Sequence, residues 1–198
     1  ELALSTGKSP EVFEALRQAA LKADRWPDVE RAVRGLIELG AGEPRTLQLE
    51  LASICERQGK FAEAARALEL ALATAEDDEG LSRLARLHEQ AGGAAGTRRA
   101  LERELALAEK GADRERSARL RLKLSKLLEG SSGDRERALQ NYAAVLAERP
   151  TDPEALAALE RMLQSPETRE AAATALEPAY RATKIGRASC RERVCYVV

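Results

Sequence analysis

The sequence predicts an all-α protein, a stack of antiparallel helix pairs. Ala, Leu, Glu and Arg, which favour helices, dominate the composition. No stretch alternates apolar and polar β-branched residues as a half-buried strand would. Apolar residues recur at helical spacing, and turns interrupt them at roughly regular intervals. Together these observations indicate paired amphipathic helices that must stack to bury their apolar faces.

The clearest unit is the 34-residue segment Arg45–Asp78. Its first half predicts a helix, because Leu47, Leu51 and Ile54 recur at helical spacing. Gly59 then predicts a turn, since glycine adopts the left-handed conformation at little cost. A second helix is predicted from four apolar residues on one face: Phe61, Ala64, Leu68 and Ala71. The two alanines indicate a close approach of the paired helices.

Four further units repeat this plan less closely. In the first, residues 10–39, Trp26 takes the place of Phe61 and Asp24 replaces the turn glycine. The third has Gly92 in its turn. The fourth matches in its second half, at Gly133, Ala138, Tyr142, Val145 and Pro150. A fifth opens where Thr151 or Asp152 is expected to cap a helix that Pro153 begins.

This pattern resembles the tetratricopeptide repeat: a Leu in the first helix, a turn Gly, an aromatic residue, then Ala, a large residue and Ala. The matching residues are Leu51, Gly59, Phe61, Ala64, Leu68 and Ala71. Ala52 stands where the family usually has Gly, and the terminal Pro of the repeat is missing. The resemblance covers roughly residues 10–183. It implies an α-solenoid, a right-handed superhelical stack of antiparallel helix pairs, whose first helices line a surface on which peptides commonly bind.

Residues 1–183 are therefore interpreted as about four and a half repeats, a fragment of a longer protein. Residues 184–198 break from this composition and carry two of the three Cys. They resemble a translated sequencing adapter, so we expect them to be a non-native tail. Without them 28 basic and 32 acidic residues remain. The remaining body is mildly acidic, which does not favour nucleic acid as a partner.

No catalytic, metal-binding or cofactor motif stands in the sequence, so neither an enzymatic activity nor a cofactor is expected. The one histidine, His88, lies on the inward stripe of its helix, and we expect it to be packed there. It lies in a different repeat from Cys55, so a nucleophilic pair is not expected. The glycines of residues 91–96 lack the Lys-Ser/Thr end of a phosphate loop.

Basic residues follow one face of the segment 114–129, at Arg116, Arg119, Lys123 and Lys126. Such a stripe could bind phosphate or an acidic peptide. The favoured interpretation is a solvated face, aided by Glu on nearby helices. Some tetratricopeptide co-chaperones hold a terminal carboxylate with paired Asn and basic residues. Because the body has a single asparagine, Asn141, that clamp is not expected here.

The predicted function is a non-enzymatic protein–protein interaction or scaffold module. The alternative is a helical regulatory or linker region of a larger enzyme, signalling or secretion protein. The expected partner is another protein or peptide. Membrane insertion is not expected, because no window approaches eighteen uninterrupted apolar residues. The sequence leaves the compartment open, with a cytoplasmic location slightly favoured.

Partner contacts are expected on first-helix residues that lie two positions either side of a core Leu. Such residues are rotated roughly 200° from that Leu on a helix of 3.6 residues per turn. They are Glu14 and Gln18 in the first repeat, Leu49 and Ser53 in the second, and Ser82 and Arg86 in the third. Leu49 is the apolar member of this set. It is expected to be the main contact, or to lie in the core if the register is shifted.

Overall fold

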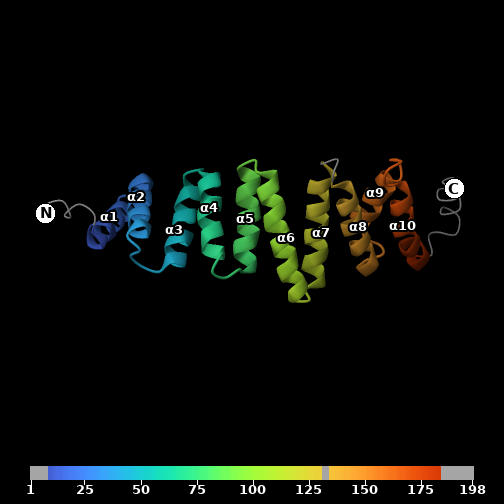
Figure 1. Cartoon of the computed structure of the whole chain (residues 1–198), viewed down its shortest axis with the longest axis horizontal. Coiled ribbons are helices and arrows are strands. Elements are labelled where there is room, and N and C mark those ends of the chain that lie inside the picture. The colour runs from blue at the N-terminus through green and yellow to red at the C-terminus, as the bar shows by residue number, and fades with distance from the viewer. Residues whose placement is uncertain (1–8, 131–133, 184–198) are drawn as a thin grey trace. The chain divides into compact units, whose positions relative to one another are not determined.

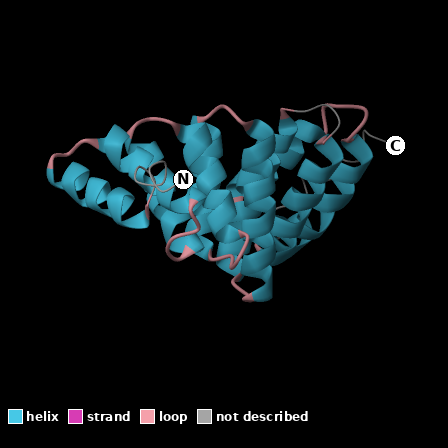
Figure 2. Cartoon of the chain, turned by 60° about the vertical axis from the view of Figure 1, so that its left-hand side comes forward, coloured by secondary structure: helices cyan, strands magenta, loops and turns pink. Residues whose placement is uncertain are grey.

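The computed structural model describes residues 9–130 and 134–183, and these ranges contain ten α-helices and no strand (Figure 1, Figure 2). The helices are α1 (Pro10–Lys22), α2 (Trp26–Glu38), α3 (Pro44–Arg57), α4 (Phe61–Leu72), α5 (Asp78–Gln90), α6 (Ala94–Lys110), α7 (Arg114–Glu129), α8 (Arg135–Glu148), α9 (Pro153–Met162) and α10 (Arg169–Thr183). The predicted all-α class is confirmed.

The chain divides into two units, which are described separately. Unit 1 ends at Ala100 and unit 2 begins at Leu101, so the boundary falls within α6. In unit 1, α2 packs on α1 and α3, and α4 packs on α3 and α5. In unit 2, α8 packs on α7 and α9, and α10 packs on both α8 and α9. Helices thus contact their near neighbours in the chain, as in repeat proteins.

The predicted turns adopt the left-handed backbone conformation. Gly59 and Gly92 both have φ of 72°, where glycine avoids the steric cost that a Cβ would add. Asp24, which replaces the turn glycine of the first repeat, has φ of 55°. Aspartate is among the residues that tolerate this region best. The first repeat therefore keeps the turn geometry without the glycine.

The core of the clearest unit is the one that the sequence predicts. Ala64, Leu68 and Ala71 are fully buried, and Leu51 is buried with 8% of its surface exposed. Both alanines lie on the buried face of α4, which packs on α3 and α5. A larger side chain at Ala64 would have to displace atoms that already fill this contact.

Acidic residues cap several helices at their first turn. Asp152 accepts hydrogen bonds from the backbone N–H groups of Glu154 and Ala155, at 3.2 and 3.0 Å. Of the two predicted caps for this helix, Asp152 is therefore the one used. Asp77 does the same for α5, accepting from the Gly80 N–H at 2.7 Å. These carboxylates satisfy N–H groups that have no partner within the helix.

The predicted tail, residues 184–198, lies outside the described residues, so its adapter-like origin stays a prediction. Among the helices of the described ranges, none combines the length and the apolar character needed to cross a membrane.

Candidate functional site: the first-helix face of unit 1

The candidate site is the face of unit 1 formed by the first helices of its repeats, α1, α3 and α5. We call it the first-helix face. The six predicted contact residues lie on these helices and differ in exposure. Gln18, Ser82 and Arg86 are exposed, whereas Glu14, Leu49 and Ser53 are half-buried. Exposure alone leaves all six accessible to some degree.

Ion pairs join α1 to α3 on this face. The Arg17 guanidinium binds the Glu50 carboxylate and, on its own helix, the Glu14 carboxylate, each at 2.7 Å. Gln18 donates to the same Glu14 oxygen at 3.3 Å. The hydrogen bond from Arg17 lowers the pKa of Glu14 below its ordinary value. Glu14 and Gln18 thus form one cluster around a charged carboxylate.

A second network joins α3 to α5. Arg83 donates to the Glu56 carboxylate at 2.9 Å and to the Ser53 hydroxyl at 3.1 Å. Arg86 donates to the other Glu56 oxygen at 2.8 Å. The Ser53 hydroxyl in turn donates to the Leu49 carbonyl at 2.9 Å. The structure therefore brings the predicted residues Ser53 and Arg86 into one network. Ser82 takes no part in these hydrogen bonds.

Sequence reasoning missed the charged residues that tie the first helices together: Arg17, Glu50, Glu56 and Arg83. A signal was present in the sequence. The opposite charges of each pair stand 27 to 33 positions apart, close to the length of one repeat. Equivalent positions of successive first helices are neighbours in a repeat stack. A search for opposite charges at that separation would have found these pairs.

Leu49 is half-buried, so it is neither a fully exposed contact residue nor a fully buried core residue. Its neighbours in the apolar stripe, Leu47 and Leu51, are only 7% and 8% exposed. The register that places Leu51 in the core is therefore correct. Leu49 lies at the margin between the core and the first-helix face, so its role as a contact stays a prediction.

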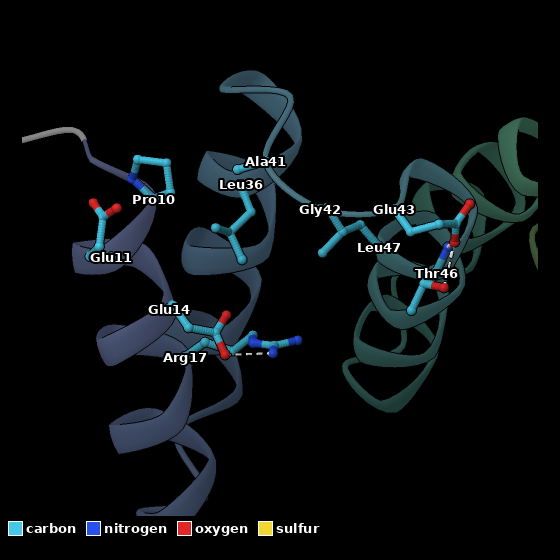
Figure 3. Close-up of a pocket in the computed structure, with 10 residues that line it drawn as sticks. All are labelled: Pro10, Glu11, Glu14, Arg17, Leu36, Ala41, Gly42, Glu43, Thr46 and Leu47. Atoms are coloured by element: carbon cyan, nitrogen blue, oxygen red, sulfur yellow. Dashed lines mark hydrogen bonds and ion pairs between the residues drawn. The ribbon is translucent and has the colours of Figure 1, made fainter.

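A pocket of about 450 Å³ opens between α1 and α3 on the first-helix face (Figure 3). We call it the α1–α3 pocket. Its lining residues come from α1, α3 and the connection that follows α2: Pro10, Glu11, Glu14, Arg17, Leu36, Ala41, Gly42, Glu43, Thr46 and Leu47. Leu36 and Leu47 are buried and give it an apolar floor. Of the six predicted residues, it contains Glu14.

A second pocket, of about 420 Å³, is lined mainly by the second helices α2 and α4, with Gln48 and Leu51 of α3. Leu70 stands at its edge and is 61% exposed, the most exposed large apolar residue in the described ranges. Its charged lining is balanced, because it contains two arginines, Arg34 and Arg66, and two glutamates, Glu38 and Glu63. Nothing in this lining favours a ligand of one charge.

A cluster of titratable side chains lies between α2, α3 and α4, in which Glu30 and Cys55 are buried and Glu63 is exposed. Potential ligand atoms of Glu30, Cys55 and Glu63 lie within 4.8 Å of one another. Lys60 donates to Glu30 at 2.7 Å, and Arg34 binds both Glu30 and Glu63. Two cations thus already neutralise the two carboxylates, which makes this donor set poorly suited to a metal ion.

The pKa shifts in this cluster agree with a structural role. Burial raises the pKa of Glu30, but hydrogen bonds from Lys60, Arg34 and Gln58 outweigh it and lower the pKa overall. Burial raises the pKa of the Cys55 thiol above its ordinary value. A protonated thiol is a poor nucleophile and a poor metal ligand. The sequence did not predict this cluster, because its members come from three helices.

His88 is half-buried, as expected, and packs against the backbone of Gly96. A Cβ on that glycine would lie only 2.3 Å from the His88 Nδ1 atom. The imidazole therefore fills a contact between α5 and the start of α6, and the absence of a side chain at position 96 makes room for it.

The basic stripe of α7 is largely paired. Arg116 binds Glu104 of α6 at 2.8 Å, and Lys126 binds Glu154 of α9 at 2.7 Å. Arg119 lies 3.8 Å from Glu115 one turn away. Glutamates on the same and neighbouring helices thus neutralise much of the stripe, as the solvated-face interpretation predicts.

Comparison with known proteins finds similarity at the level of structure only. No protein-family model matches the chain, and no curated protein matches it either. A solved tetratricopeptide-repeat protein from Bacteroides fragilis superposes with a TM-score of 0.54 at 15% identity, covering 89% of this chain and 86% of that one.

Two further solved structures align less closely. MamA aligns with a TM-score of 0.48 at 15% identity, over 91% of this chain and 94% of that one. The tetratricopeptide-like repeats of a putative kinesin light chain from Podosopora anserina give 0.47 at 20% identity, over 92% and 100%. The first likeness, together with the helix pairs and their left-handed turns, establishes the architecture. The chain has the fold of the tetratricopeptide-repeat proteins.

Proposed function

We propose that the chain is a non-enzymatic scaffold module that binds another protein or peptide on the first-helix face of unit 1. The observation that carries this proposal is the α1–α3 pocket, an open, apolar-floored cavity rimmed by polar groups on that face. Concave sites that combine an apolar floor with a few polar groups are typical ligand sites. An extended segment could lie across α1 and α3 with one side chain in the pocket.

The state of the reactive side chains supports a binding function over a catalytic one. Cys55 is fully buried, and its pKa is raised. His88 packs against Gly96 rather than facing either pocket. Neither residue lines the α1–α3 pocket. Ser82 and Arg86, in contrast, are exposed there and available for contacts with a partner.

The proposal can be tested by selecting ligands from a displayed library of random ten-residue peptides. Selected peptides should slow backbone hydrogen exchange in α1, α3 and α5. Leu49→Glu should weaken their binding about tenfold or more, because it places a charge at the half-buried margin of the face. Leu70→Glu is the matched control, since it makes the same change on a second helix. It should leave binding unchanged.

Three results would contradict the proposal. The library could yield no ligand, the exchange footprint could fall on α2 and α4, or Leu49→Glu could bind like the wild type. A sharp fall in the melting temperature of Leu49→Glu would place Leu49 in the core, and the face would then be redrawn around Glu14 and Arg86. The alternative function, a regulatory or linker region of a larger protein, predicts a catalytic, signalling or secretion domain in the full gene.

A further inference from the structure

The floor of the α1–α3 pocket suits an aliphatic side chain. Leu36 is 5% exposed and Leu47 is 7% exposed, so each presents only a small apolar surface to the cavity. Ala41 and Pro10 complete the apolar part of the lining. The volume of about 450 Å³ lies within the usual range for small-ligand sites, so it can hold one side chain with its adjoining backbone.

The rim of the pocket is acidic on both sides. Glu11 and Glu14 come from α1, and Glu43 comes from the start of α3, with Leu36 between them (Figure 3). The one basic residue in the lining is Arg17, and it is already bound to Glu14 and Glu50. The lining therefore holds three carboxylates and one cation whose charge is already shared, and the Glu43 carboxylate is turned toward Thr46 (Figure 3).

These three carboxylates are ionised at neutral pH. The pKa of each lies below its ordinary value, for a local reason that differs from one to the next. Glu11 accepts a hydrogen bond from the Ser9 side chain, Glu14 from Arg17, and Glu43 from the hydroxyl and the N–H of Thr46. The rim is therefore negatively charged at neutral pH, where Lys and Arg side chains are positively charged.

We infer that the α1–α3 pocket binds an extended protein segment in which one aliphatic residue is flanked by Lys or Arg. The aliphatic side chain contacts Leu36 and Leu47, and the flanking cations lie beside Glu11 and Glu14 on one side and Glu43 on the other. The inference rests on the proposed function and adds the chemistry of the partner. Charge complementarity of this kind selects partners and speeds their encounter.

The probe is the most enriched basic peptide from the library selection, synthesised with a fluorescent label. We expect enriched sequences to place Leu, Ile or Val next to Lys or Arg. In anisotropy titrations, the double variant Glu11→Gln, Glu14→Gln should bind this peptide about 5- to 10-fold more weakly. The effect of two partly solvated ion pairs is of this order. Raising the salt concentration should weaken wild-type binding, because salt screens exposed charges.

A double-mutant cycle separates this contact from a general loss of charge. Replacing with Gln the one Lys or Arg of the peptide that lies beside Glu11 and Glu14 should weaken wild-type binding by a similar factor. Combined with the protein variant, it should add little, because the same interaction has already been lost. The peptide-side change needs no protein variant, so it tests the inference even if the double variant is less stable.

Two matched controls complete the test. Glu136→Gln with Glu170→Gln removes two exposed first-turn carboxylates from α8 and α10 of unit 2, and it should leave binding unchanged. Ala41→Phe fills the pocket without changing charge and should abolish binding. Ala157→Phe, at an exposed alanine of α9, should not. Melting curves confirm that each variant is folded.

The outcomes distinguish this inference from the proposed function. If ligands bind the first-helix face without a basic preference, or bind Ala41→Phe as well as the wild type, the inference is overturned and the proposed function stands. If no ligand binds the first-helix face, the proposed function fails as well.

Discussion

The helix pairs α3–α4 of unit 1 and α7–α8 of unit 2 have the same plan but different interiors. Leu51 corresponds to Leu124 and Ala64 to Ala138, and all four are buried. At the next large position, Leu68 in α4 is replaced by Tyr142 in α8, and both are 0% exposed. The repeat pattern therefore fixes the position and the large size of this side chain, and it leaves the chemistry free.

The polar interior of α7–α8 is tolerated because its hydroxyls have partners. The Tyr142 hydroxyl donates to the Glu129 carboxylate at 2.5 Å. Ser125, which takes the position of Ala52, is fully buried and donates to the Arg121 carbonyl at 2.7 Å. A buried hydroxyl without a partner would cost about 1–3 kcal/mol, so these bonds are what makes the substitution possible.

The same comparison extends to the end of the first helix. Glu56 in α3 and Glu129 in α7 occupy equivalent positions. Glu56 binds Arg83 and Arg86 of the next first helix, α5. Glu129 instead accepts from Tyr142 of its own pair and lies 3.5 Å from Arg161 of α9. In unit 1 this glutamate therefore links two successive repeats, whereas in unit 2 it also links the two helices of its own repeat.

The largest expected loss of stability comes from truncating a large side chain in the apolar interior. Leu68→Ala should lower the free energy of unfolding by about 2–5 kcal/mol, because it leaves a cavity at a site with no exposed surface. Leu51→Ala should cost a similar amount. Urea denaturation followed by circular dichroism measures both. A loss below about 1 kcal/mol in either variant would show that the assigned core register is wrong.

Overfilling the close contact should cost less and should do so in both pairs. Ala64→Leu and Ala138→Leu each add volume at a 0% exposed site, so each should destabilise by about 1–3 kcal/mol. The same denaturation experiment compares them, with Ala62→Leu at an exposed site of α4 as the control. Equal losses would support a shared packing geometry. A silent change in one pair would show that its helices lie further apart.

Removing the tyrosine hydroxyl tests the polar interior directly. Tyr142→Phe should lower the free energy of unfolding by about 1–2 kcal/mol, because the Glu129 carboxylate loses a buried partner. Leu68→Met, a change of similar size without a hydrogen bond, is the control in unit 1. A neutral or stabilising Tyr142→Phe would mean that the apolar interior of α3–α4 is the better solution in both units.

The difference in the free energy of unfolding between the wild type and Tyr142→Phe should depend on pH, in a direction set by the pKa of Tyr142. Burial, and then the hydrogen bond to Glu129, raise the pKa of Tyr142 above its ordinary value of about 10. The folded state therefore holds the phenol proton more tightly than the unfolded state. The stabilisation is fully present below about pH 10 and is lost as the pH rises further. The gap between wild type and Tyr142→Phe should be constant from pH 7 to 9 and narrow above pH 10.

The sequence was sufficient for the elements and their interiors, because these depend on local spacing. Gly59, Leu68 and Ala71 hold the turn and the core positions that the repeat pattern predicts. It was not sufficient for the α1–α3 pocket or for the Glu30–Cys55–Glu63 cluster. Both depend on how neighbouring helices pack in space, and the residues involved have ordinary spacing within their own helices. Surface geometry follows from packing, which no single-helix pattern encodes.

The smallest expected effect on stability concerns Arg86, one of the residues predicted to contact a partner. Its guanidinium binds Glu56, but the Arg86 side chain is 58% exposed, and Arg83 holds the same carboxylate. An exposed ion pair contributes about 0–1 kcal/mol, and here Glu56 keeps its second partner. Arg86→Ala should therefore change the free energy of unfolding by less than about 0.5 kcal/mol, measured by urea denaturation.

Because this variant is expected to fold like the wild type, any loss of peptide binding can be attributed to the surface itself. Arg119→Ala, at an exposed arginine of α7 that lies 3.8 Å from Glu115, is the matched control in unit 2. If Arg86 contacts the partner, Arg86→Ala should weaken binding of the selected peptides while Arg119→Ala does not. If both variants bind equally well, Arg86 does not belong to the proposed surface. Its role is then limited to the ion pair with Glu56.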